Sequence, residues 1–352
     1  MMKAKNVYAI ASDPIYIGTG GYTIGRVDNT IVRDPITRIP KIPGTSVAGT
    51  MRFYSALELQ FAFTDEYRVE PRRREGKKIH EMINEKKVDW YSYEGNKWAL
   101  MKCAGQDDRP NESYPNDDFS LMDAEKSGHC GKCIICKTFG YSKKNKSSQQ
   151  GLVFFSDLNI LLFPVYTRAG VKWITSKQLL GLANILLDDF SNDNEVFLLS
   201  DKEKKQGTIN LGWINLPYKT KNSLPSISKL LQSVDEDNKY NIIENIVLVP
   251  DKLISQIINS NLEVRTSVSI DPLTGAAKEN ALFTSEAIPR GTIFSGDIRI
   301  MERPVSNEYP NAEIIETMIN EVAKYYEIFG IGGMVTRGFG RIKIILQNQF
   351  SK

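Results

Sequence analysis

The stretch Ile42-Pro43-Gly44-Thr45-Ser46-Val47-Ala48-Gly49-Thr50-Met51-Arg52 contains the start of a helix that determines how the rest of the chain is interpreted. Thr45 or Ser46 is a natural N-cap, because a hydroxyl can accept a hydrogen bond from the first free amides of a helix. The spacing of the apolar residues predicts one buried helix face, made of Val47, Met51, Tyr54, Leu57 and Phe61.

A second face of this helix is polar and carries a glycine. Thr45, Gly49 and Arg52 are spaced at i, i+4 and i+7, so they line up along one side. A glycine inside a helix costs about 1 kcal/mol relative to alanine. This favours close approach by another backbone, with Arg52 directed toward the anion-binding end of the helix. A glycine that admits a neighbouring helix, together with a solvated arginine, explains the same residues equally well.

Outside this helix the chain alternates between strand and helix patterns. Residues 7–11 read as a strand, and the four glycines of residues 18–25 are followed by an extended segment rather than a helix. A dinucleotide or phosphate loop would pass directly into a helix, so nucleotide binding of those kinds is disfavoured. Residues 311–328 form the clearest helix, with one apolar face made of Ile314, Ile315, Met318, Ile319, Val322 and Tyr326.

The segment after this helix, residues 329–341, is rich in glycine and arginine and precedes a strand at residues 342–346. Exposed amides, positive charge and the ring of Phe339 are the means by which phosphate backbones are bound. We interpret this loop as a binding element rather than a plain turn. The residues that we assign to phosphate contacts are Gly332, Gly333, Arg337, Gly338, Gly340 and Arg341.

Residues 263–291 are predicted to form a long hairpin. Apolar residues alternate along its first half, residues 271–275 turn the chain, and an extended segment returns. Apolar side chains at the tip of such an arm could insert between stacked groups. An ordinary hairpin within a sheet is an equally good interpretation of the pattern.

The composition is that of a globular protein of mildly basic charge. The chain has 352 residues, 41% of them hydrophobic and 25% charged, and Lys+Arg minus Asp+Glu is 45 − 42 = +3. These values exclude a wholly disordered chain and require any nucleic-acid site to be a local patch. We expect no membrane span, because no apolar run approaches 18 residues, and no signal peptide. The expected location is cytoplasmic.

Three of the four cysteines lie together as Cys130, Cys133 and Cys136. In a reducing compartment this spacing favours a metal over disulfides, and a structural zinc site needs four N or S ligands. The fourth ligand could be Cys103, His129 or His80. We favour Cys103, because it would use every cysteine, with His129 as the alternative. Buried thiols without metal are the competing interpretation, and the zinc-deaminase signature is absent.

Two segments read as insertions. Residues 64–150 are rich in charge and contain the cysteine cluster, whereas residues 200–245 are polar and poor in periodicity. We expect the second segment to be peripheral.

Taken in order along the chain, several of these motifs resemble one family. They are Gly18-Thr19-Gly20, Val27-Asp28-Asn29 through Arg33-Asp34-Pro35, the 42–52 stretch, the cysteine cluster, Phe154-Phe155-Ser156-Asp157, Ser269 to Gly275, and Gly332 to Arg341. The chain is similar to the RAMP superfamily of CRISPR effector proteins. It most resembles the repeated backbone subunit of type III complexes, Cmr-type (III-B) more than Csm-type (III-A).

The resemblance implies an α+β fold and a single RAMP domain over residues 1–352, with a ferredoxin-like (RRM-type) palm, an inserted zinc-bearing region and a thumb β-hairpin. It also implies copies of the chain stacked along a CRISPR guide RNA and assembled with other effector-complex subunits. Thr45, Ser46, Gly49, Arg52 and the glycine loop would then hold guide phosphates. The thumb residues Ile270, Leu273 and Phe283 would wedge between bases of the guide–target duplex.

Active members of the family cleave target RNA at regular intervals, and the position that matches their acid is Asp28. A Mg²⁺ or Mn²⁺ ion could stabilise the developing charge there. From the residues alone, Asp13 and Asp34 are as plausible as Asp28, which could simply hydrogen-bond its own loop. The alternatives to an endoribonuclease are a non-catalytic guide-binding filament subunit and a zinc-stabilised RNA-binding protein outside CRISPR.

Overall fold

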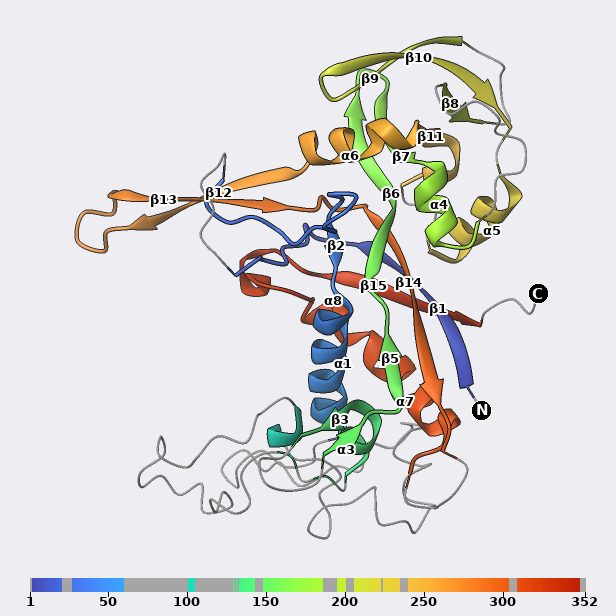
Figure 1. The fold of residues 1–352 in the computed structure, drawn as a ribbon. Helices are drawn as coiled ribbons and strands as arrows, with labels where there is room; N and C mark the ends of the chain where they lie inside the picture. Colours follow the sequence, from blue (N-terminus) through green and yellow to red (C-terminus); the bar gives the residue numbers. More distant parts are fainter. Residues whose placement is uncertain are drawn as a thin grey trace.

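The computed structural model describes residues 2–20, 27–59, 101–104, 129, 131, 133–142, 148–185, 195–200, 206–222, 224–234, 240–303 and 309–348. Its centre is an antiparallel sheet, here called the palm sheet, in the order β15-β1-β14-β6 (Figure 1). These strands are β1 (Met2–Ala11), β6 (Leu158–Thr167), β14 (Ile293–Met301) and β15 (Ile342–Asn348). The chain passes through α1 (Gly44–Leu59) after β1, and through α7 (Ala312–Ala323) before β15.

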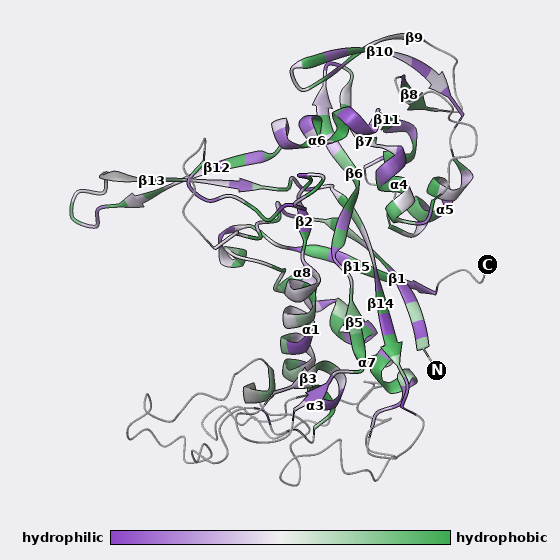
Figure 2. Ribbon diagram, in the orientation of Figure 1, coloured by the Kyte–Doolittle hydropathy of each residue, from purple (hydrophilic) through white to green (hydrophobic). Residues whose placement is uncertain are grey.

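The first strand is buried on both faces. Val7, Ala9 and Ala11 belong to the main core, whereas Tyr8 and Ile10 belong to a second hydrophobic cluster on the other side of the sheet. Successive side chains of a strand point to opposite faces, so a continuous apolar run marks a strand that is covered twice. Figure 2 shows the same concentration of hydrophobic residues along β5 (Val153–Phe155), which pairs with β14, and along α7.

The amphipathic helix predicted at residues 311–328 is present, and the six residues of its predicted apolar face are all buried. Asn311 caps it, because its side-chain oxygen accepts a hydrogen bond from the amide of Ile314 at 3.0 Å. The helix ends at Ala323, and a separate short helix, α8 (Tyr325–Ile328), follows it. The helix pattern is therefore confirmed and its length is shorter than predicted.

Strands beyond β6 continue the sheet away from the palm, in the order β7-β11-β8-β10-β9. The described part of residues 200–245 is regular structure, although its sequence is poor in periodicity. Its helix α5 buries Ile227, Leu230, Leu231 and Val234. The elements of this outer region are β7 (Gly170–Thr175), α4 (Lys177–Leu182), β8 (Val196–Leu199), β9 (Gln206–Leu211), β10 (Ile214–Lys221), α5 (Pro225–Val234), η5 (Ile242–Asn245), β11 (Ile246–Leu248) and α6 (Asp251–Ser260).

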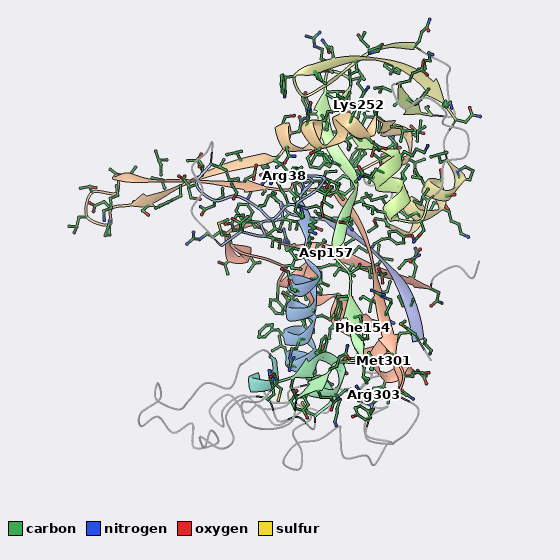
Figure 3. All side chains as sticks on the ribbon, in the orientation of Figure 1. Arg38, Phe154, Asp157, Lys252, Met301 and Arg303 are labelled. Atoms are coloured by element: carbon green, nitrogen blue, oxygen red, sulfur yellow. The ribbon has the colours of Figure 1, made fainter. Side chains whose placement is uncertain are left out.

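The predicted hairpin is formed by β12 (Glu263–Ile270) and β13 (Ala277–Ala287), here called the thumb. The two strands pair antiparallel from Glu263 opposite Ala287 to the tip, and they form a sheet of their own. Figure 1 shows the thumb projecting from the body, and Figure 3 shows its side chains directed into the space around it. It is therefore a free arm rather than a hairpin within a larger sheet.

A small region packs at the C-terminal end of α1 (Figure 1). It contains η2 (Met101–Ala104), α3 (Ile134–Phe139), β3 (Gly140–Tyr141) and β4 (Gln149–Gln150). Most of the predicted 64–150 insertion, including His80 and Cys130, lies outside the described residues. In the described parts of the chain, no helix is both long and apolar enough to cross a membrane.

Candidate functional site

Asp28 lies at the base of the thumb with its carboxylate exposed to solvent. Its Oδ2 accepts a hydrogen bond from the backbone amide of Thr284 at 2.8 Å and from the Thr284 hydroxyl at 2.7 Å. The amide of Asp28 donates in turn to the same hydroxyl at 3.0 Å. The Thr284 amide, followed by its hydroxyl, lowers the pKa of Asp28 below the ordinary aspartate value. Asp28 therefore presents a stable negative charge, which suits cation binding better than proton abstraction.

The two competing aspartates are engaged in contacts within the chain. Asp13 accepts two hydrogen bonds from Arg341, at 2.5 and 2.9 Å, and the donation from this guanidinium lowers the pKa of the Asp13 carboxyl. Asp34 accepts from the amides of Thr37 and Ile36, at 2.9 and 3.0 Å, and so closes a turn. Of the three candidates, Asp28 alone is exposed. Exposure thus distinguishes Asp28, which the family resemblance had already selected, from the other two aspartates.

The loop that carries Asp28 is joined to the thumb like an additional strand. The amide of Asn29 donates to the carbonyl of Thr284, and the amide of Glu286 donates to the carbonyl of Asn29, both at 3.0 Å. Arg33 forms an ion pair with Glu286 at 2.6 Å, with both side chains largely buried. The position of Asp28 is therefore fixed relative to β13.

The other thumb strand is tied to the glycine loop. Arg265 of β12 donates to the carbonyl of Gly338 at 3.1 Å, and its guanidinium lies 4.7 Å from the ring centre of Phe339. Arg265 also pairs with Glu263 at 2.6 Å. Both strands of the thumb are thus anchored on loops of the palm.

Several residues of the glycine loop also pack against other parts of the chain. Gly332 and Gly340 have positive φ, and a Cβ on either would collide with the backbone oxygen of Tyr16 or Ile331. Phe339 is buried against Tyr16 and under Arg265, so its ring cannot stack on a base, and Arg341 is paired with Asp13. The close packing around Gly332 and Gly340 therefore explains two of the glycines without any ligand. Of the predicted loop residues, Gly332, Arg337, Gly338 and Arg341 are exposed, whereas Gly333 is half-buried and Gly340 buried.

The N-terminus of α1 is already occupied by a carboxylate of the chain. The helix begins at Gly44, so Thr45 and Ser46 lie in its first turn rather than at the N-cap. Asp157 fills the capping role, because its Oδ1 accepts from the amide of Gly44 at 2.8 Å. Lys41 pairs with Asp157 at 2.6 Å, and Figure 3 labels Asp157 at this end of the helix.

Arg52 does not point toward that end of the helix. Its Nε donates to the carbonyl of Cys103 at 2.6 Å, its Nη1 to the carbonyl of Gly140 at 2.8 Å, and its Nη2 lies 3.0 Å from Nδ1 of His129. The exposed face of α1 instead runs from Thr45 through Gly49 to Phe53. An added Cβ at Gly49 would meet no described atom within 4 Å, so this glycine is not required by the packing that the structure describes. Arg52 therefore contacts the cysteine region within the chain, and its role in binding guide phosphate stays a prediction.

The described cysteines gather at one point. The Sγ atoms of Cys103, Cys133 and Cys136 lie within 4.8 Å of one another, and all three residues are fully buried. They lie in a hydrophobic cluster with residues of α1 and α7. Three buried thiols this close together could bind a metal ion. The fold brings Cys103 to the other two cysteines, from which it is separated by a long stretch of sequence. The predicted ligand Cys130 lies outside the described residues.

The thumb presents apolar side chains to solvent, from Ile270 and Leu273 at its tip to Phe283 near its base. Ile270 is 65% exposed, Leu273 94% and Phe283 49%. Exposed apolar groups gathered on a projecting arm indicate a contact with another molecule. These features together define an α+β protein with a central palm sheet and an anchored apolar thumb that has an acidic side chain at its base.

Comparison with known proteins agrees with this description. The RAMP superfamily model matches residues 11–343, and the chain belongs to this superfamily. It is 25% identical to the CRISPR system Cmr endoribonuclease Cmr4 of Pyrococcus furiosus over 237 residues, which are 60% of this chain and 75% of that protein. A shorter match, 58% identical over 36 residues, is to the Csm3 endoribonuclease of Methanothermobacter thermautotrophicus, covering 10% of this chain and 15% of that protein.

Two solved structures share the fold. The crystal structure of oligomeric Cmr4 from Pyrococcus furiosus superposes with a TM-score of 0.54 at 18% identity, over the full length of both chains. A chain of the type III-B Cmr-beta complex bound to cognate target RNA superposes with a TM-score of 0.57 at 14% identity, over 97% of this chain and 96% of that one. The fold is thus shared along the whole chain.

Thr284, Asp157 and Arg265 were not identified as functional from the sequence. Thr284 and Arg265 lie in the hairpin pattern with no signal that separates them from their neighbours. Asp157 belongs to a motif of the family resemblance, but its pairing with the start of α1 is visible only in the structure.

Proposed function

We propose that this chain is a guide-RNA-binding backbone subunit of a type III-B CRISPR effector complex, and that it cleaves complementary target RNA through Asp28. The supporting observation is the exposed carboxylate of Asp28 at the base of an apolar thumb. The similarity to a Cmr endoribonuclease supports the reaction class. Neighbouring structures that are oligomeric or bound to target RNA support the assembly of copies along RNA with other subunits.

The thumb is suited to enter a guide–target duplex. Ile270, Leu273 and Phe283 offer apolar surface to bases, since every base has an aromatic face on which such groups can pack. The exposed face of α1 with Thr45 and Gly49 would lie against the guide backbone, and Ser46 beside it. The exposed Arg337 and Gly338 of the glycine loop would add phosphate contacts. Base pairing would supply sequence recognition while the protein recognises backbone shape.

The reaction that fits this site is transesterification within the target RNA. Displacement of a base next to the thumb allows the ribose 2′-oxygen to attack the phosphorus of the 3′-phosphate on the same nucleotide. A bond forms between the 2′-oxygen and phosphorus, and the bond to the 5′-oxygen of the next nucleotide breaks. The 2′-hydroxyl releases its proton to solvent and the leaving 5′-oxygen takes one up, which gives a 2′,3′-cyclic phosphate and a 5′-hydroxyl. Placement of the reacting atoms in line is the main contribution of the protein.

A divalent cation, Mg²⁺ or Mn²⁺, fits Asp28 as a single protein ligand. The carboxylate is exposed and its lowered pKa keeps it ionised at neutral pH. In the described parts of the chain, the only group of three or more potential ligands is the cysteine cluster, so RNA oxygens and water would complete the coordination. The ion would supply charge neutralisation at the phosphate. Asp28 holds the negative charge that places it there.

We also propose a structural zinc site made of Cys103, Cys130, Cys133 and Cys136. It is supported by the convergence of the three described thiols. The palm is proposed to be ferredoxin-like, since two helices and the strand order β15-β1-β14-β6 correspond to the split β-α-β pattern. The cytoplasm remains the proposed location.

The test of the function is cleavage of labelled complementary RNA by the assembled complex in Mg²⁺ or Mn²⁺. Wild type is compared with Asp28→Ala and with the isosteric Asp28→Asn, and a non-complementary RNA controls for contaminating nuclease. We expect a ladder of regularly spaced products from the wild type and none from either variant, with target binding retained. A ladder that persists in both variants would reject Asp28. Absence of cleavage by all forms would favour the alternative, a non-catalytic filament subunit.

A further inference from the structure

The carboxylate of Asp28 has one specific partner among the described residues, and this partner belongs to the thumb. Thr284 places two donors, its amide and its hydroxyl, on the same oxygen, Oδ2, at 2.8 and 2.7 Å. The Asp28 amide donates back to the hydroxyl at 3.0 Å. Such a closed set of hydrogen bonds defines both the position and the rotation of a carboxylate that solvent would otherwise leave free to rotate.

We infer that Thr284 is a positioning residue for the Asp28 carboxylate: by holding Oδ2, it leaves Oδ1 as the oxygen directed to the target RNA. This inference rests on the proposed function. The hydroxyl is the part of this arrangement that depends on residue type, because every amino acid except proline supplies the amide. A residue that lacks the hydroxyl would leave Oδ2 with one donor and the Asp28 amide without its acceptor.

The position of Thr284 in the thumb gives this contact a second consequence. Thr284 directly follows Phe283, an exposed side chain of the proposed wedge, and successive side chains of a strand point to opposite faces. The backbone of the Asp28 loop is bonded to the same part of β13 through Asn29 and Glu286. One short segment of β13 therefore carries both a residue of the proposed wedge and the partner that orients the acid.

The experiment compares Thr284→Val, which removes the hydroxyl at nearly constant volume, with Thr284→Ser, which keeps it. Thr266→Val is the matched control, because Thr266 is the exposed cross-strand partner of Thr284 in β12. Two quantities are measured on assembled complex: the single-turnover cleavage rate at saturating complex, and the complex concentration that half-saturates target RNA binding. Asp28→Ala is included in the series.

We expect Thr284→Val to lower the cleavage rate by about 10- to 100-fold, the range for partners that orient a functional ligand, while RNA binding is unchanged. Thr284→Ser should restore the rate, and Thr266→Val should cleave like the wild type. The inference is overturned if Thr284→Val cleaves at the wild-type rate, if it loses target binding, or if serine fails to restore cleavage. If Asp28→Ala itself cleaves normally, the proposed function fails, and this outcome is distinct from a failure of Thr284 alone.

Discussion

The Nη2 atom of Arg52 lies 3.0 Å from Nδ1 of His129. A guanidinium can only donate, so Nδ1 of His129 must accept, and the proton of the neutral ring is then on Nε2. Neither ring nitrogen retains a free lone pair for a metal ion. This contact argues against His129 as the fourth zinc ligand and favours the set made entirely of cysteines.

The first prediction concerns zinc content. Cys103→Ser should reduce bound zinc from about one ion per chain to well below it, because a structural zinc site needs four strong ligands. His129→Gln should leave the zinc content unchanged. Metal analysis of the purified variants by mass spectrometry measures both. Loss of zinc from His129→Gln with retention in Cys103→Ser would show that the ligand set is misassigned.

The second prediction compares the stability effects of replacing Arg52, which is hydrogen-bonded within the chain, and Arg337, which is exposed. Arg52→Met leaves the carbonyls of Cys103 and Gly140 without their charged donor, which should lower the free energy of unfolding by about 3 kcal/mol. Arg337→Met, at an exposed position, should change it by less than about 0.5 kcal/mol. Urea denaturation measures both values.

Arg52→Met and Arg337→Met should also differ in how strongly guide-RNA binding depends on salt concentration. If Arg337 contacts a phosphate, its replacement should reduce the salt dependence of guide binding, whereas Arg52→Met should not. Equal salt dependence in Arg337→Met and wild type would exclude Arg337 from the interface.

The third prediction concerns Gly49 in α1. A Cβ at this position meets no described atom within 4 Å, so Gly49→Ala should stabilise the isolated chain by about 1 kcal/mol. If the guide backbone or a neighbouring copy lies against this glycine, the same variant should bind guide RNA or assemble less well. Gly181→Ala is the matched control, because Gly181 is also helical and has open space. If Gly49→Ala binds guide RNA and assembles like the wild type, neither the guide backbone nor a neighbouring copy needs to lie against Gly49.

The fourth prediction concerns the pH dependence of the Asp13–Arg341 pair. The folded-state pKa of Asp13 is lowered, chiefly by the hydrogen bond from Arg341. The pair therefore contributes stability above the unfolded aspartate pKa of about 3.9, and this contribution is lost as pH falls through the lower folded value.

Asp13→Asn should accordingly be less stable than wild type at pH 7, and the difference should shrink as pH falls below about 4. Urea midpoints of both proteins from pH 7 to pH 3 test this, since the comparison cancels other carboxylates. Arg341→Met should give a similar loss at pH 7. A difference that stays constant down to pH 3 would contradict the assignment.

The elements defined by local periodicity could be predicted from the sequence. The apolar face of α7 and the alternating thumb strands with their turn are patterns within a short window, and both are present. Interactions between distant segments could not be predicted in the same way. Arg341 reaches Asp13 across 328 positions and Arg52 reaches Gly140 across 88, so both arginines were assigned to phosphate.

The packing around the glycine loop could not be predicted from the sequence either. The sequence indicates where a side chain is missing but not which atoms occupy that space. Gly332 lies against Tyr16, whereas Gly49 lies next to open space, and the two look alike in sequence. Asp28 was selected over Asp13 and Asp34 by the family resemblance, and its greater exposure is a further difference that only the folded chain defines.

The pairing of β1 has a consequence for synthesis of the chain. Val7 pairs with Gly296 on one side and with Leu346 on the other, so the ribosome makes both neighbours of β1 long after β1 itself. Until those segments have emerged, β1 has two unsatisfied edges and its apolar residues lack their cover. A chain that terminates before β14 and β15 would therefore be a substrate for chaperones and proteases.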